Sequence, residues 1–228
     1  MSLIVTHRPS PNFNARKAPV SILVLHYTGM ETGEAAIERL CDPEAGVSAH
    51  YVVEEDGAVL QLVAESDRAW HAGMGAWAGR KDVNSASIGI EIVNGGHEFG
   101  LPAFAAAQIE SVIALSRDIL SRHPIAPDGV IGHSDMAPDR KQDPGERFPW
   151  ARLAAAGVGL WPAADAPCAI VDDVGSALKA IGYPVGAAIS VDQAVMAFQR
   201  RFRTSRIDGV ADAETRARIG QVFAAYRH

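Results

Sequence analysis

The chain has 228 residues, of which 48% are hydrophobic, and a formal net charge of −6. This length fits one ordinary domain plus a small second one, with enough apolar residues to build a core. The acidic balance argues against a nucleic-acid binder or a protein that binds anionic membranes, because both need an excess of Lys and Arg.

The N-terminal segment has none of the features of a secretory signal peptide: a basic start, an apolar run or a small-residue cleavage site. No stretch of the sequence approaches the roughly 18 apolar residues that a transmembrane helix needs. We therefore expect a cytoplasmic protein without a membrane span. A leader missing from the sequence would make a periplasmic location the alternative.

The first predicted strand is the run 20–25, which is apolar apart from Ser21. A continuous apolar run of this length is typical of a strand that is buried on both faces. The run ends at His26, so this imidazole is expected at the end of the strand. Residues 31–40 then predict a helix, since apolar residues recur at helical spacing after an acidic start.

Residues 49–64 predict a β-hairpin, because the turn dipeptide Asp56-Gly57 separates two apolar runs. The Gly- and Trp-rich segment 70–84 follows, and it is too long and irregular to serve only as a connection. Residues 88–93 are again apolar at most positions and predict another strand.

Residues 104–123 form the longest segment with helical periodicity, and Pro124 ends it. The short apolar pair 130–131 then predicts a strand that leads into His133. Strands and helices thus alternate with both hairpin and crossover connections. The predicted fold class is α/β, with a mixed central β-sheet flanked by helices.

An Ala- and Pro-rich stretch, residues 161–168, is typical of a linker and separates a first domain, residues 1–160, from a second, residues 169–228. We expect three short amphipathic helices in the second domain. The middle helix begins with the capping-box pair Ser190 and Gln193. About sixty residues with three such helices make a small three-helix domain.

Two histidines stand where apolar runs end, His26 and His133, and the carboxylate Asp143 follows in a polar segment. Two histidines and one carboxylate leave the fourth position of a tetrahedral site open, which is the pattern of a catalytic zinc site. A histidine after a strand is nevertheless more often an ordinary polar residue than a ligand. The spacing alone therefore indicates a candidate metal site and no more.

Six short motifs occur in order along the first domain, and together they closely resemble those of the N-acetylmuramoyl-L-alanine amidases of the amidase-2 family. That family is related to peptidoglycan recognition proteins and phage lysozyme-like amidases. The resemblance covers roughly residues 3–160. The motifs are His26-Tyr-Thr28, Val47-Ser-Ala-His-Tyr51, Ala69-Trp-His-Ala-Gly73, Ser87-Ile-Gly-Ile-Glu91, Gly132-His133 and Arg140-Lys-Gln-Asp-Pro-Gly145.

This resemblance implies one zinc ion per chain, held by His26, His133 and Asp143. It implies hydrolysis of the amide between the lactyl group of N-acetylmuramic acid and L-alanine. At the matching positions, Glu91 looks like the general base that activates the attacking water. Lys141 looks like the cation that stabilises the tetrahedral oxyanion. Taken alone, Glu91 and Lys141 would be ordinary solvent-facing residues.

Further motif residues are expected to wall the substrate groove: His50, Trp70, His71, Arg80 and Asn84. His50 fits a core or supporting histidine equally well, and Trp70 is as compatible with supporting its loop as with stacking on a sugar. The remaining histidines lack a motif context and are expected at the surface; they are His7, His97, His123 and His228.

The second domain carries Ala197-Phe-Gln199, followed by Asp208-Gly209 and then by Asp212 and Thr215. This pattern resembles the three-helix peptidoglycan-binding domain. The alternative is a helical appendage that only packs on the first domain.

Three functions follow in order of preference. The first is a zinc amidase that acts on peptidoglycan or muropeptides, including the 1,6-anhydro form, in cell-wall turnover. Without a leader, soluble fragments in recycling are favoured over intact wall as the substrate. The second is a non-catalytic peptidoglycan recognition module, which would not need Glu91 and Lys141 beside the ligands. The third is a zinc peptidase that cuts another amide.

Overall fold

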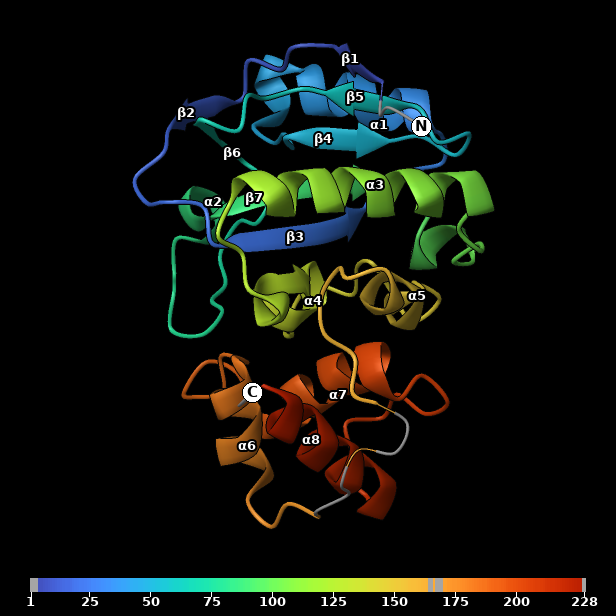
Figure 1. Ribbon diagram of the computed structural model, residues 1–228. Coiled ribbons are helices and arrows are strands. Elements are labelled where there is room, and N and C mark those ends of the chain that lie inside the picture. Colours follow the sequence, from blue (N-terminus) through green and yellow to red (C-terminus); the bar gives the residue numbers. More distant parts are fainter. Residues whose placement is uncertain (1–3, 164–165, 167–169, 227–228) are drawn as a thin grey trace.

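The computed structural model describes residues 4–163, 166 and 170–226. Within these residues a six-stranded sheet forms the centre of the molecule, in the order β1-β5-β4-β7-β3-β8 (Figure 1). Neighbouring strands are parallel except for the antiparallel β4–β5 pair, so the predicted mixed sheet is confirmed. Its strands are β1 (Val5–His7), β3 (Ile22–Tyr27), β4 (Tyr51–Val53), β5 (Val59–Gln61), β7 (Ser87–Ile92) and β8 (Val130–Gly132). A separate antiparallel pair consists of β2 (Phe13–Ala15) and β6 (Asp67–Ala69).

The predicted hairpin is the β4–β5 pair, and its turn lies against the long helix α3 (Ala106–Arg122). Gly57 adopts φ +91° in this turn. A Cβ at this position would lie 2.9 Å from the carbonyl oxygen of Ala107 on α3. Glycine is therefore required here both by the backbone conformation and by the close approach of the helix.

Side chains along β3 and β7 alternate between the two faces of the sheet. One face packs against α3 through Leu23, Leu25, Ile88, Ile90 and Ile92. The other face carries the paired positions Ile22 with Ser87, Val24 with Gly89, and His26 with Glu91. Strands β3 and β7 thus place a histidine and a carboxyl group side by side, away from α3.

The other helices of the first domain are short. Helix α1 begins at the N-cap Thr32, whose hydroxyl accepts a hydrogen bond from the backbone N–H of Ala35. Figure 1 shows α3 lying across the sheet and α4 and α5 on the side toward the C-terminal helices. The bounds are α1 (Gly33–Cys41), α2 (Val83–Ala86), α4 (His133–Met136) and α5 (Trp150–Ala155), with 3-10 turns at Pro43–Ala45, His97–Phe99 and Pro127–Gly129.

Three C-terminal helices follow in the described residues: α6 (Val174–Ile181), α7 (Val191–Phe202) and α8 (Ala213–Ala225). The predicted capping box is confirmed, because Ser190 and Gln193 each accept a hydrogen bond from the other's backbone N–H. The apolar side of α7 buries Val195, Phe198 and Phe202, whereas Val191 is 37% exposed. This residue is in the first turn of the helix, where the chain enters from the surface.

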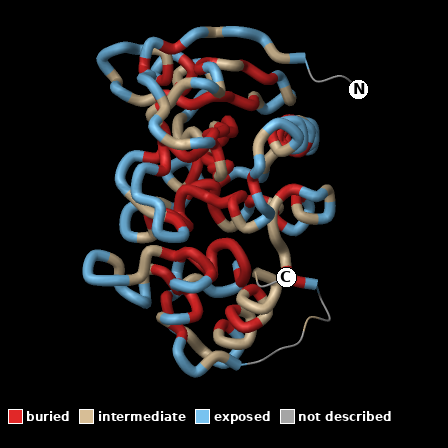
Figure 2. Tube along the Cα trace, turned by 60° about the vertical axis from the view of Figure 1, so that its left-hand side comes forward, coloured by how far each residue is buried: buried red, intermediate tan, exposed pale blue. Residues whose placement is uncertain are grey.

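The C-terminal helices share a hydrophobic core with the first domain. Phe198 and Leu178 belong to one buried cluster with Val24 of β3 and Trp77 of the long loop. Figure 2 shows this buried interior continuing between the two parts of the chain. Of the predicted linker, residues 164, 165, 167 and 168 lie outside the described residues, and the boundary at residue 160 stays a prediction.

A buried ion pair also joins the two parts. Arg201 of α7 donates to Asp135 of α4 at 2.9 Å, and both side chains are almost fully buried. The Tyr183 hydroxyl donates to the other oxygen of Asp135 at 2.8 Å. The backbone N–H of Gly132 donates to Asp135 as well, at 2.9 Å. These contacts fix α4 against α7.

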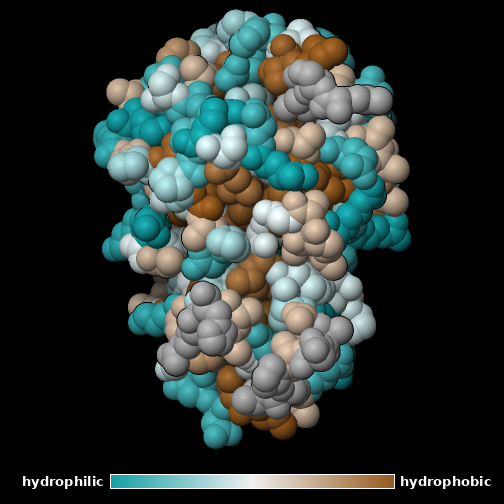
Figure 3. Space-filling view, in the orientation of Figure 1, coloured by the Kyte–Doolittle hydropathy of each residue, from teal (hydrophilic) through white to brown (hydrophobic). Residues whose placement is uncertain are grey.

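The surface has both hydrophilic and hydrophobic areas, as expected from a sequence in which 48% of the residues are hydrophobic. Figure 3 shows hydrophilic areas that separate smaller hydrophobic ones on the face in view. Among the described residues, no helix combines the length and the apolar character needed to cross a membrane.

Candidate metal centre and catalytic cavity

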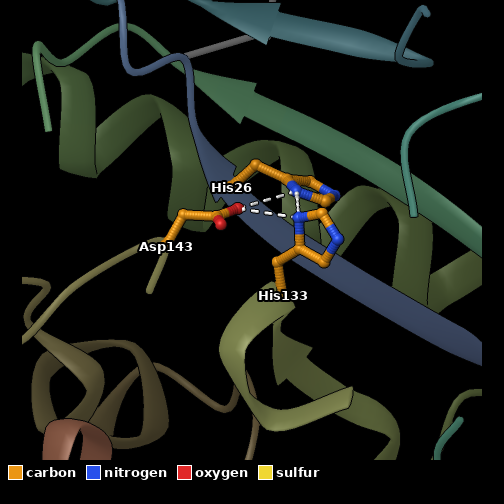
Figure 4. Close-up of side chains that lie close together, drawn as sticks. All are labelled: His26, His133 and Asp143. Atoms are coloured by element: carbon orange, nitrogen blue, oxygen red, sulfur yellow. Dashed lines mark hydrogen bonds and ion pairs between the residues drawn. The ribbon is translucent and has the colours of Figure 1, made fainter. Parts of the chain in front are cut away.

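Three side chains from separate elements converge at one point (Figure 4). His26 comes from β3, His133 is the first residue of α4, and Asp143 lies in the loop that follows. His26 Nδ1 lies 3.0 Å from His133 Nδ1, and Asp143 Oδ2 lies 3.0 and 3.1 Å from these two atoms. The structure therefore brings together the three residues that the sequence singled out as metal ligands.

The chemistry of these three atoms fits a metal cation. His133 Nε2 lies 2.9 Å from the backbone oxygen of Ala72, which can only accept, so the ring proton is on Nε2 and Nδ1 carries a lone pair. The carboxylate oxygen of Asp143 is likewise an acceptor. A tetrahedral zinc site with bonds of about 2.0–2.1 Å separates its ligand atoms by about 3.3 Å, close to the distances found here.

Burial keeps His26 in the neutral form that binds metals. Removal from water, and then the nearby His133, lowers the pKa of His26 to about 4. Burial alone would raise the pKa of Asp143, but the adjacent His133 and His26 outweigh it and hold this pKa below its usual range. At neutral pH the centre thus offers a neutral imidazole beside an ionised carboxylate.

Glu91, which was predicted to be the general base, lies beside the candidate ligands. It pairs with His26 across strands β3 and β7 and lines the same cavity as the three ligands. Its Oε2 atom is buried and has no hydrogen-bond partner among the described residues. Burial, followed by the charge of Asp143, raises the pKa of Glu91 well above its usual value, and Lys141 opposes this shift. A raised pKa makes this carboxylate a stronger base than an exposed glutamate.

The cavity around the centre has a volume of about 470 Å³. Lys141, predicted to stabilise the oxyanion, is part of its lining. Arg140 also lines it and donates to the backbone oxygen of Ala72 at 2.8 Å and to that of Met74. The lining residues are 26–30, 36, 39, 40, 47, 48, 70, 71, 91, 95, 97, 98, 133 and 140–143.

The predicted substrate-binding residues divide into two groups. Trp70 and His71 line the cavity. His50, Arg80 and Asn84 are not among the residues that line this cavity. Arg80 is an exposed residue whose backbone pairs with that of Trp77. The Asn84 side chain instead accepts hydrogen bonds from the backbone N–H groups of His71 and Ala72.

His50 is a core histidine, the alternative that the sequence had left open. It is fully buried. Its Nδ1 accepts a hydrogen bond from the backbone N–H of Gly89 at 3.0 Å, which leaves the proton on Nε2, 3.1 Å from the backbone oxygen of Asp67. Burial, as the largest cause, lowers the pKa of His50 to about 3.

One group at the cavity was missed by the sequence analysis. Tyr27 and His97 both line the cavity, although His97 was expected to be an ordinary surface residue. Tyr27 Oη lies 2.9 Å from His97 Nδ1, and His97 Nε2 lies 3.0 Å from Glu146 Oε2. Burial and then the charge of Asp143 raise the pKa of Tyr27 to about 12. The position of Tyr27 directly after a predicted ligand was the available signal.

Comparison with known proteins finds relatives that are named as N-acetylmuramoyl-L-alanine amidases. AmiD of Escherichia coli is 38% identical across 87% of this chain and 80% of its own length. AmpD of Escherichia coli, a 1,6-anhydro-N-acetylmuramyl-L-alanine amidase, is 35% identical across 64% of this chain and 87% of its own length.

Solved structures agree over nearly the whole chain. The complex of Escherichia coli AmiD with anhydro-N-acetylmuramic acid-L-Ala-D-gamma-Glu-L-Lys is 36% identical, with a TM-score of 0.82 and 93% of both chains covered. AmpDh3 of Pseudomonas aeruginosa in complex with anhydromuramic pentapeptide is 33% identical, with a TM-score of 0.83 and 96% of both chains covered. The family model described as N-acetylmuramoyl-L-alanine amidase matches residues 16–146, and the chain belongs to this amidase family.

Proposed function

We propose that this protein is a zinc-dependent amidase that cleaves the bond between N-acetylmuramic acid and L-alanine in muropeptides, including those with 1,6-anhydro-muramic acid. The observation that carries the proposal is the convergence of His26, His133 and Asp143 in the same cavity as Glu91. The solved relatives that hold anhydro-muramic peptides support this substrate class.

His26, His133 and Asp143 would hold one zinc ion, with a fourth position left open. Zinc supplies Lewis acidity for a carbonyl group and lowers the pKa of coordinated water to about 7. Glu91 takes a proton from the attacking water and delivers it to the nitrogen of L-alanine as the amide breaks. The Lys141 ammonium offsets the negative charge that develops on the lactyl carbonyl oxygen. The water oxygen ends in the lactyl carboxylate, and its second proton goes to the amine of L-alanine, which leaves as an ammonium group.

The reaction is tested with anhydro-N-acetylmuramic acid-L-Ala-D-gamma-Glu-L-Lys and with intact sacculi, followed by mass spectrometry. The proposal predicts the free anhydro-sugar acid and an intact tripeptide from the soluble substrate. Binding without cleavage by zinc-loaded protein would indicate a recognition module instead. Cleavage between two amino acids would indicate a peptidase.

We further propose that the protein acts in the cytoplasm on soluble recycling fragments. Fractionation of cells that express the native gene tests this location. Recovery of the protein with the periplasm or the envelope would contradict it.

A further inference from the structure

The dipeptide His71-Ala72 contacts both histidine ligands at Nε2, the ring nitrogen that is not directed at the metal centre. The His71 side chain contacts His26, and the Ala72 carbonyl contacts His133. The side-chain oxygen of Asn84, on α2, accepts hydrogen bonds from the backbone N–H groups of His71 at 3.0 Å and of Ala72 at 2.7 Å. One amide group therefore holds the segment that contacts both ligands.

A series of hydrogen bonds leads from Val83 through Ser87 and His71 to His26, and the donor and the acceptor can be assigned at each step. The Ser87 hydroxyl donates to the backbone oxygen of Val83 at 2.6 Å, because a carbonyl can only accept. Ser87 Oγ is then an acceptor for His71 Nε2, which lies 3.1 Å away. His71 therefore carries its proton on Nε2 and has a lone pair on Nδ1.

This lone pair determines the tautomer of the metal ligand. His71 Nδ1 lies 3.0 Å from His26 Nε2, so His26 donates a proton from Nε2. His26 Nδ1 is left with its lone pair directed toward His133 and Asp143. Outer partners of this kind commonly fix the ring orientation and tautomer of a metal-binding histidine.

The position of the His71 ring is enforced by packing against β7. A Cβ at Gly89 would lie 2.5 Å from the ring, so the imidazole rests directly on the strand backbone. His71 and Asn84 are both buried. The ring thus occupies a space that glycine provides between Ser87 and Glu91 on the same face of the strand.

We propose that His71 and Asn84 are positioning residues that hold both histidine ligands in the tautomer with Nδ1 free for the metal. His71 acts on His26 through its side chain, and Asn84 acts on both ligands through the His71-Ala72 backbone. This inference rests on the proposed zinc-dependent function. It gives these two residues a role different from the substrate contact expected from the sequence.

The test compares His71→Asn with His71→Leu, using zinc affinity from competition with a chromogenic chelator. Asparagine places an acceptor oxygen near the position of Nδ1, so its affinity should stay within about threefold of wild type. Leucine removes the acceptor, and zinc should bind about 10–100-fold more weakly, as for other outer partners of metal ligands. Equal affinities for wild type and His71→Leu would overturn the inference.

A second variant guards against a folding defect in His71→Leu. Ser87→Ala removes the acceptor for His71 Nε2 and should weaken zinc binding, whereas the matched control Ser116→Ala, a buried serine on α3, should not. Nitrogen-15 NMR of the metal-free protein should show His26 protonated on Nε2 in wild type and a tautomer mixture in Ser87→Ala. An unchanged His26 tautomer together with unchanged zinc affinity would refute the inference.

The two proposals fail in different ways. Wild-type protein that neither binds zinc nor hydrolyses the muropeptide overturns the proposed function, and the inference with it. Wild-type protein that does both, with His71→Leu and Ser87→Ala unchanged in affinity, overturns only the positioning role.

Discussion

Two buried polar clusters lie on either side of the short helix α4, and they differ in how their charges are satisfied. Asp135 receives hydrogen bonds from Gly132, Tyr183 and Arg201, so its negative charge has a cation and donors within the fold. On the other side, His26, His133 and Asp143 direct acceptor atoms at one another.

This contrast separates a cluster that stabilises the fold from one that binds a ligand. We call the cluster of Asp135, Arg201, Tyr183 and Gly132 the closed cluster, and the cluster of His26, His133 and Asp143 the open cluster. A buried charge needs a partner, and the Asp135 cluster contains its own. The acceptors of the metal centre need a cation from outside the chain. Substitutions in the two clusters should therefore change different properties of the protein.

The largest effect is expected from His133→Ala in the open cluster. Loss of this ligand should abolish zinc binding and lower turnover by more than about a thousandfold, because the pKa of water then returns from about 7 toward 15.7. The unfolding midpoint of the metal-free protein should fall less than that of the Arg201 variant described next, because the removal of one facing acceptor offsets part of the lost hydrogen bond from His133 to Ala72. Zinc analysis, hydrolysis assays and urea unfolding check this. Full turnover in this variant would contradict the assignment of His133 as a required metal ligand.

The next effect is expected from Arg201→Met in the closed cluster. Asp135 would remain buried without its cation, which typically costs about 3–5 kcal/mol of unfolding free energy. Urea unfolding of the metal-free protein at pH 7 measures the loss. The double variant Asp135→Asn, Arg201→Met should recover more than half of it, because no buried charge is left. A loss of unfolding free energy below about 1 kcal/mol in the single variant would show that Asp135 does not depend on the charge of Arg201.

A smaller effect concerns pH and the buried His50. Its pKa is near 3 in the folded protein and near 6.5 when unfolded, so the unfolded state gains a proton first as the pH falls. Its contribution to stability is present above about pH 6.5 and is lost progressively from there toward pH 3. Between pH 7 and pH 5 this amounts to about 2 kcal/mol. His50→Gln should flatten the pH dependence of urea unfolding by that amount, and an unchanged slope would contradict a neutral core histidine.

The smallest effect is expected from Tyr183→Phe. This change removes one donor from Asp135 and leaves Arg201 in place, so the loss should be about 1–2 kcal/mol. Zinc affinity should stay the same, because the Tyr183 hydroxyl donates to Asp135 and not to a metal ligand. Weaker zinc binding would show that the two sides of α4 are coupled.

The sequence predicted five strands of the large sheet (β3, β4, β5, β7 and β8), the long helix and the ligand set, because these depend on local patterns and on ordered motifs. It did not predict β1 or the pair β2–β6, whose three-residue strands carry no clear local pattern. It did not predict the hydrogen bonds of Asn84, His71 or His97. Their neighbours come from distant parts of the chain, such as Ser87 beneath His71 and Glu146 beside His97. The ion pair of Asp135 with Arg201 could not be predicted for the same reason, because the two residues are distant in the sequence and no local pattern links them.

The central claim is that the open cluster on α4 holds one zinc ion that the reaction requires. The most direct measurement removes metal with a chelator, adds zinc back in steps and follows cleavage of anhydro-N-acetylmuramic acid-L-Ala-D-gamma-Glu-L-Lys by mass spectrometry. We predict no cleavage without metal and full cleavage at one zinc per chain, with His133→Ala inactive throughout. Full activity in protein shown to contain no metal would contradict the account.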